Sequence, residues 1–195
     1  MVNELYHYGI KGQKWGVRRY QNEDGTYTAL GKELRNSKKS PTLFVSGSSK
    51  TEFKDHKYYR KNLPKDVTDE LDSAMRSKKK IILGDAPGID RQVQKYLNKK
   101  KYNNVTVYSP GSKNRYLANP TWKVKFVDSK KYTEGSEEWL AKKDKAMLNV
   151  ADEGLAVVIE NGGSSATRKN VDLLISQNKN VKVYELSEIE DKWIK

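Results

Sequence analysis

The chain has 195 residues, a formal net charge of +13 and a mean hydropathy of −0.91. It contains no cysteine, and its only histidines are His7 and His56, which excludes disulfides, thiolate metal sites, cysteine nucleophiles and histidine-rich metal centres. No apolar run reaches membrane-spanning length and the N-terminus lacks a signal-peptide core, so we expect a soluble protein made in a cytoplasm, with no membrane partner and no bound metal. The positive charge suits nucleic acid or anionic ligands such as nucleotides.

In chain order, residues 1–40 come first as a basic, aromatic extension without a sustained apolar period, and "NSKKSP" at 36–41 reads as its linker. Residues 41–195 then alternate strand-like apolar runs with helical periodicity. Residues 111–133 look irregular and suggest a loop over the sheet edge. The pattern predicts strands at 42–49, 80–85, 104–110, 155–161 and 180–186, helices at 64–78, 88–100, 136–152 and 164–179, and a short terminal helix at 187–195.

This alternation predicts an α/β fold, because parallel strands need crossover helices that then cover both faces of the sheet. We expect a Rossmann-like sandwich with about five mainly parallel strands and the small N-terminal extension. The run "LAVVIEN" at 155–161 is the most apolar and is expected at the centre. On the helix at 164–179, Val171, Leu174 and Ile175 are expected to face inward.

Small polar loops follow three of the predicted strands, at 46–49, 84–88 and 161–167. In open parallel sheets, ligands bind at the carboxyl ends of strands, near the point where strand order reverses. Glycine lets the backbone approach a ligand closely, and successive N–H groups beside a helix N-terminus cradle anions. Any one loop could be an ordinary capped turn, but three together indicate a phosphate or nucleotide site. Arg168 could bind a phosphate or lie exposed on its helix, and Tyr108, Tyr116 and Trp122 could stack on a base or pack the loops.

The segment "GDAPGID" at 84–90 resembles the GGARGID-type loop of the SLOG superfamily, which includes DNA-processing protein A, the lonely-guy enzymes and the YspA-like proteins. The "SGS" loop, "KDKAMLNVAD" at 143–152 and "GGSSATRKNVDLL" at 162–174 follow the family's motifs in order. The resemblance implies a nucleotide-binding Rossmann-like fold. With the loop analysis it gives these candidate nucleotide-binding residues: Ser46, Gly47, Ser48, Ser49, Gly84, Asp85, Gly88, Asp90, Asp144, Gly162, Gly163, Ser164, Thr167 and Arg168.

The resemblance leaves open whether the protein is an enzyme. The lonely-guy enzymes carry a glutamate three residues after the motif threonine, and here that position is Asn170. Asp85, Asp90 and Asp144 remain catalytic candidates, since three carboxylates meeting at one cleft would perturb one another's pKa. If the protein is an enzyme, an N-glycosidic hydrolase of nucleotides or nucleosides is the expected class.

The stretch "HYGIKGQKWGVRRYQ" at 7–21 resembles a signature found at the ends of many tailed-phage and prophage proteins, often encoded among head-morphogenesis genes. The resemblance implies phage origin and docking of residues 1–30 to head proteins. It also implies a location in the host cytoplasm, with the virion as a second location. Aromatic and basic side chains suit such docking better than independent folding. The candidate docking residues are His7, Lys11, Lys14, Trp15, Arg18, Arg19 and Tyr20.

Three functions are compatible with these patterns. The first is a phage SLOG-like domain that binds a nucleotide or an ADP-ribose-like, NAD-derived ligand, and so sequesters or senses a host signal. The second is the N-glycosidic hydrolase of the same fold. The third is a DNA-binding or structural head-associated protein whose charge neutralises nucleic acid non-specifically. A homo-oligomer is compatible with each.

Overall fold

A computed structural model describes residues 20–22, 24–37, 40–49, 62–128, 130–159 and 165–186. The chain divides into two compact units, Met1–Ser40 and Pro41–Lys195. The described part of the first unit holds helix α1, Ala29–Ser37, which the sequence analysis missed and which runs into the predicted linker. At its start, the Thr28 hydroxyl accepts a hydrogen bond from the Gly31 N–H at 3.1 Å, an N-cap that helps the helix begin without a long apolar face.

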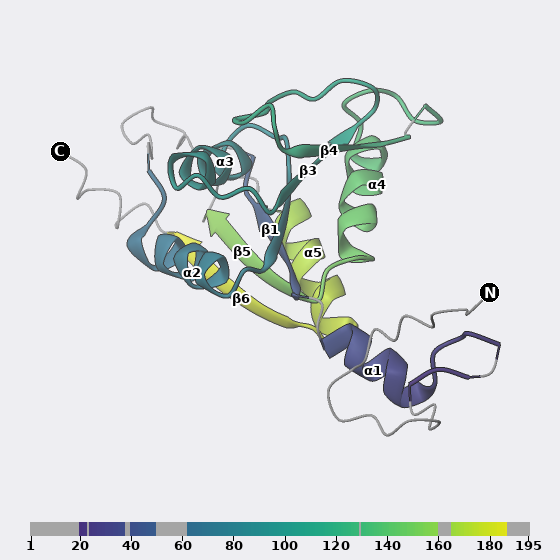
Figure 1. The fold of residues 1–195 in the computed structure, drawn as a ribbon. Coiled ribbons are helices and arrows are strands. Elements are labelled where there is room, and N and C mark those ends of the chain that lie inside the picture. The colour runs from purple at the N-terminus through teal and green to yellow at the C-terminus, as the bar shows by residue number, and fades with distance from the viewer. Residues whose placement is uncertain are drawn as a thin grey trace, which may run out of the picture. The chain divides into compact units, whose positions relative to one another are not determined.

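The second unit is an α/β domain with a six-stranded sheet in which every strand pair is parallel. Helices α2 and α3 cover one face and α4 and α5 cover the other (Figure 1), which confirms the predicted Rossmann-like sandwich. In chain order the elements are β1 (Thr42–Gly47), α2 (Lys65–Arg76), β2 (Lys80–Gly84), α3 (Ile89–Lys99), β3 (Val105–Pro110), β4 (Lys123–Val127), α4 (Glu137–Leu148), β5 (Glu153–Ile159), α5 (Ser165–Ser176) and β6 (Asn180–Leu186). The predicted terminal helix at 187–195 lies outside the described residues.

Strand β4 corrects the predicted number of five strands. It forms within 111–133, which the sequence analysis treated as irregular, and it pairs with β3 at the edge of the sheet. Lys123, Lys125 and Phe126 are exposed on this strand. An edge strand with polar, exposed positions lacks the apolar run that marks a buried strand. No helix separates β3 from β4, so the alternation of elements could not reveal it either.

The core occupies both faces of the sheet. Along β1, Leu43 and Val45 pack in the cluster that includes α2 and α3, whereas Phe44 packs in the cluster beneath α4 and α5. Successive residues of a strand point to opposite faces, so a strand buried on both faces reads as the continuous run "TLFV". On α5 the expected inward face is wrong in part: Leu174 is buried, but Ile175 is 57% exposed.

The strand order is β4-β3-β2-β1-β5-β6. The chain therefore moves outward from β1 to β4 and then returns to add β5 and β6 on the other side of β1. This corrects the expectation of a central β5, which lies one strand from the edge. The reversal between β1 and β5 is the point where ligands bind in sheets of this kind.

Within the described residues, no helix is both long and apolar enough to cross a membrane.

Candidate functional site

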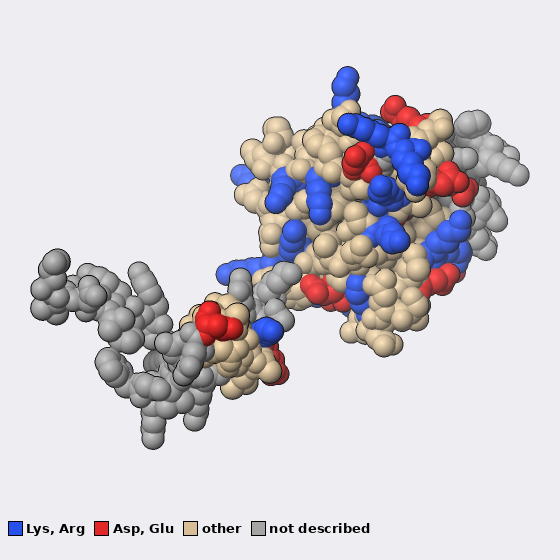
Figure 2. Space-filling view, turned by 90° about the vertical axis from the view of Figure 1, so that its right-hand side faces the viewer, with Lys and Arg blue, Asp and Glu red and all other residues tan. Residues whose placement is uncertain are grey.

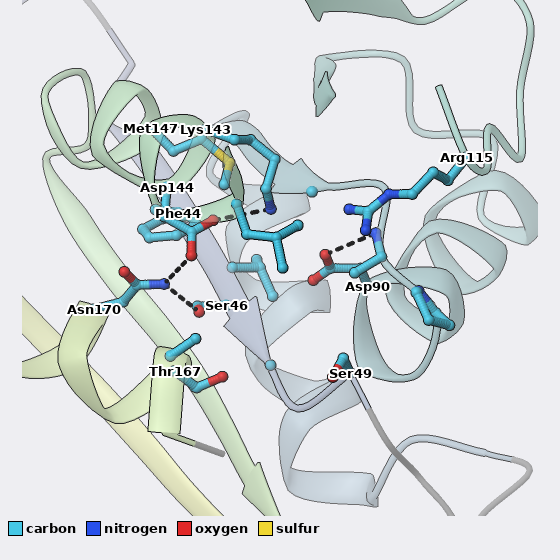
Figure 3. A pocket seen from close by; sticks show the side chains of 17 residues that line it. Phe44, Ser46, Ser49, Asp90, Arg115, Lys143, Asp144, Met147, Thr167 and Asn170 are labelled. Carbon is cyan, nitrogen blue, oxygen red and sulfur yellow. Dashed lines mark hydrogen bonds and ion pairs between the residues drawn. The ribbon is translucent and has the colours of Figure 1, made fainter. Parts of the chain in front are cut away.

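A pocket of about 270 Å³ lies at this reversal point, beyond the carboxyl ends of β1 and β2 and beside the start of α5 (Figure 3). Helix α4 and Arg115, from the segment after β3, supply the remaining lining. The volume lies just below the range of about 300–1,000 Å³ that is usual for small-ligand sites. The lining mixes apolar and ionisable side chains: Phe44, Val45, Ser46, Gly47, Ser49, Gly84, Ala86, Pro87, Asp90, Arg115, Leu140, Lys143, Asp144, Met147, Ala166, Thr167 and Asn170.

The loops after β1 and β2 are in direct contact. The Ile89 N–H donates to the Ser48 carbonyl oxygen at 3.1 Å. Gly88, at the N-cap of α3, has φ +84° and packs so closely that a Cβ there would lie 2.5 Å from the carbonyl oxygens of Ser48 and Ser49. A Cβ at Gly47 would likewise collide with the side chain of Ile89. Glycine at these positions therefore allows the two strand tips to form one continuous wall.

Two buried ionisable side chains form the floor of the pocket. Asp90 and Lys143 are each 5% exposed, and both reach over Gly84, where a Cβ would lie 2.4 Å from Asp90 Oδ2 and 2.6 Å from Lys143 Nζ. Asp90 Oδ2 also accepts a hydrogen bond from the Ala86 N–H at 3.3 Å. The absence of a side chain at residue 84 is thus what admits this pair of charges above the tip of β2.

From Lys143 a polar network crosses the pocket to β1. Lys143 Nζ lies 2.9 Å from Asp144 Oδ1, and Asp144 Oδ2 accepts from Asn170 Nδ2 at 3.1 Å. The same amide nitrogen donates to Ser46 Oγ at 3.1 Å. Figure 3 shows these side chains converging from α4, α5 and β1. The network fixes the orientation of Asp144 beside the pocket, because each of its oxygens already has a donor.

Burial raises the pKa of Asp90 from 3.8 to about 6; Lys143 opposes the rise and Asp144 adds to it. Burial works in the opposite sense on Lys143, but the charges of Asp144 and Asp90 outweigh it and raise the pKa of the amine. Lys143 is therefore a permanent cation between two carboxyl groups. A carboxyl group that titrates near neutrality can both accept and donate a proton, so Asp90 is the side chain of this pocket best suited to proton transfer.

Asp85 lies elsewhere than the sequence analysis expected. Its side chain is fully buried and does not line the pocket. It accepts from the Arg115 backbone N–H at 2.8 Å, from Arg115 Nη2 at 2.6 Å and from Ser109 Oγ at 2.6 Å. Burial works to raise its pKa, but these bonds outweigh it and lower the pKa below its ordinary value. Asp85 therefore holds the segment after β3 in place, and two carboxylates, not three, meet at the pocket.

The other predicted site residues divide into four groups, the last of which is Arg168 alone. Lining the pocket are Ser46, Gly47, Ser49, Gly84, Asp90, Asp144 and Thr167, whereas Ser48 and Gly88 join the loops behind it, and Gly162, Gly163 and Ser164 lie outside the described residues. Arg168 pairs with Glu185 at 2.8 Å, and both side chains are more than half exposed. The reading of Arg168 as an exposed helix arginine thus fits the structure better than a phosphate contact from this position.

The stacking candidates do not reach the pocket. Tyr108 is 2% exposed and packs in the core beneath α4. The Tyr116 ring lies under the guanidinium of Arg91, 4.6 Å from its centroid. Trp122 is buried and donates its Nε1–H to the Tyr102 carbonyl oxygen. These three rings therefore support the loops, as the alternative interpretation of each one allowed.

Sequence reasoning missed Arg115, Lys143 and Asn170 as pocket residues. Arg115 belongs to the segment taken as irregular, so no periodicity placed it. Lys143 entered only as part of the motif at 143–152, and Asn170 only as the residue at the position of the lonely-guy glutamate. For Lys143 the sequence did carry a signal, because it lies four residues before Met147 and so on the same face of α4. Both residues are buried on the sheet-facing side. A lysine on an apolar helix face indicates a paired or functional charge.

Comparison with known proteins gives one match. Residues 1–22 match a protein family of unknown function, DUF7211. No curated protein and no solved structure matches the chain. The matched stretch covers all seven predicted docking residues, and all of these except Tyr20 lie outside the described residues. The match does not reach the sheet domain, so the pocket is interpreted from its own geometry.

Proposed function

We propose that the pocket binds a nucleotide or a nucleotide-derived ligand such as ADP-ribose. The observation that carries this proposal is the convergence of the β1 tip, the β2 tip and the start of α5 on one hollow at the reversal of strand order. Hydroxyl groups of Ser46, Ser49 and Thr167 line it, and the first turn of α5 contributes Ala166 and Thr167. These hydroxyl groups can donate to or accept from the polar groups of such a ligand.

The carboxylates supply the second part of a nucleotide's recognition. Ribose hydroxyls are donors, and Asp90 and Asp144 present acceptor oxygens in a partly apolar cavity lined by Phe44, Leu140 and Met147. Because Lys143 neutralises part of their charge, the floor can hold both carboxylates without strong repulsion of an anionic ligand. A sugar against the acidic floor and an apolar base against the α4 wall would use both properties.

Thermal unfolding in the presence of adenosine, AMP, NAD and ADP-ribose tests the proposal. At a hundredfold excess over Kd, a ligand that binds only the folded state adds about 2.7 kcal/mol, which corresponds to a Tm rise of about 5–10 °C for a chain of this size. Ala166→Trp places a large side chain at the pocket wall and should abolish the rise. Asp172→Trp, on the exposed side of the same helix, is the matched control and should retain it. A Tm that no nucleotide changes contradicts the proposal.

A further inference from the structure

Arg115 is the one pocket residue whose guanidinium is held rigidly from behind. Its Nε and Nη2 donate to the same oxygen of Asp85, at 3.1 and 2.6 Å, and its backbone N–H donates to the other oxygen at 2.8 Å. Ser109 Oγ bridges Asp85 Oδ2 and the Lys113 carbonyl oxygen. An anchored arginine loses little side-chain entropy when it binds a ligand, because that cost is already met in the folded state.

The part of the guanidinium that is not held faces the pocket. Figure 3 shows Arg115 reaching inward on the side of the pocket opposite Asp144 and Asn170. Its side chain is 34% exposed, and its Nη1 group makes no hydrogen bond to any residue in the described part of the chain. Beyond it, the Trp139 ring centroid lies 5.8 Å from Cζ. Guanidinium donors arranged as a fork match the oxygens of a phosphate or carboxylate group.

Lys143, the other cation that lines the pocket, is already paired with a carboxylate. Lys143 is buried between Asp90 and Asp144, and its amine lies 2.9 Å from an oxygen of Asp144. Arg168, which the sequence analysis offered for phosphate binding, is paired with Glu185 away from the lining. Among the described residues that line the pocket, Arg115 is therefore the cation with the more accessible donors, since its side chain is 34% exposed and that of Lys143 is 7% exposed.

We infer that Arg115 binds the anionic group of the pocket's ligand and so selects nucleotides over nucleosides. This inference rests on the proposed function and extends it by giving the ligand an orientation. The phosphate lies at Arg115, beside the segment after β3, and the sugar lies toward Asp144 and Asn170 on the opposite side. Asp85 acts as a positioning residue, since it fixes Arg115 without reaching the pocket itself.

Adenosine and AMP are the probes that test the inference, because they differ only in the phosphate. We expect wild-type protein to bind AMP about ten- to a hundredfold more tightly than adenosine by calorimetry, as a charge-assisted hydrogen bond implies. Arg115→Gln combined with Asp85→Asn removes both partners, so that no unpaired charge is left buried, and should equalise the two affinities while adenosine binding persists. Arg115→Lys keeps the charge without the fork and should fall between them.

Arg91→Ala is the matched control, because Arg91 is an exposed arginine stacked on Tyr116 outside the lining. It should preserve the wild-type preference for AMP. Equal binding of AMP and adenosine by wild-type protein, or an AMP preference that survives in the double variant, overturns the inference and leaves the proposed function standing. Binding of neither probe at millimolar concentration overturns the proposed function, and the role of Arg115 with it.

Discussion

Gly88→Ala is expected to destabilise the folded domain by about 3 kcal/mol or more and to abolish ligand binding, although Gly88 does not line the pocket. The residue has φ +84° and ψ −131°, a conformation open to glycine and costly to alanine by roughly 1–3 kcal/mol. The added Cβ would also lie 2.5 Å from two backbone carbonyl oxygens, those of Ser48 and Ser49. Backbone atoms cannot move aside as a flexible side chain can, so the loops after β1 and β2 must separate.

Gly135→Ala separates the two causes. Gly135 has φ +86° but no atom within 4 Å of an added Cβ, so its replacement reports the backbone conformation alone. Chemical unfolding of both variants should show a clearly larger loss for Gly88→Ala, and nucleotide binding should survive only in Gly135→Ala. Equal losses in the two variants would mean that the contact between the strand tips is not what holds the pocket wall together.

Lys143→Met is expected to cost about 3–5 kcal/mol at pH 8, the usual result of removing one partner from a buried ion pair. The substitution leaves Asp90 and Asp144 without the cation between them, and Asp90 is almost fully buried. Lys145→Met is the control, because Lys145 is an exposed lysine of the same helix; its loss should stay within about 0.5 kcal/mol. Urea unfolding of the two variants gives the comparison.

The pH dependence of this loss identifies its cause. The folded-state pKa of Asp90 is about 6, above its ordinary 3.8, so the folded state binds the proton more tightly than the unfolded state. Ionised Asp90 therefore costs stability, and the free energy of unfolding falls as the pH rises from about 4 to 6. Because Lys143 lowers the pKa of Asp90, its removal raises that pKa further. The range over which a rising pH costs stability then extends to higher pH. The deficit of Lys143→Met should be smaller at pH 5 than at pH 8; a deficit independent of pH would assign the effect to packing.

The sequence predicted most of the fold because buried parallel strands and amphipathic helices carry strong local patterns. The runs "LFV" in β1 and "IIL" in β2 are apolar at every position because both faces of the sheet are covered. Strand β4 was not predicted because it is an exposed edge strand and lacks the continuous apolar run of a buried strand. Ile175 was wrongly predicted to face inward because several apolar residues on α5 allow more than one inward face. In the structure Leu174 is the residue buried against the sheet.

The loops that build the pocket were predicted from their glycines and hydroxyls, but the partners of its charged residues were not. Asp85 and Asp90 are five residues apart and look equivalent in the sequence, yet one anchors Arg115 and the other forms the pocket floor. Asp85 directly follows β2, whereas Asp90 lies in the first turn of α3. The role of Asp85 also depends on Arg115, thirty positions away along the chain. Long-range pairing of this kind leaves no local periodicity to detect.

NMR titration with ADP-ribose tests the shared pocket most directly. The amide resonances of Gly47, Gly84 and Thr167, at three separate strand or helix ends, should shift together with one saturation curve, while those of the exposed Asp172 and Lys95 stay in place. Shifts confined to the lysines of β4, or shifts at only one of the three ends, would contradict the account.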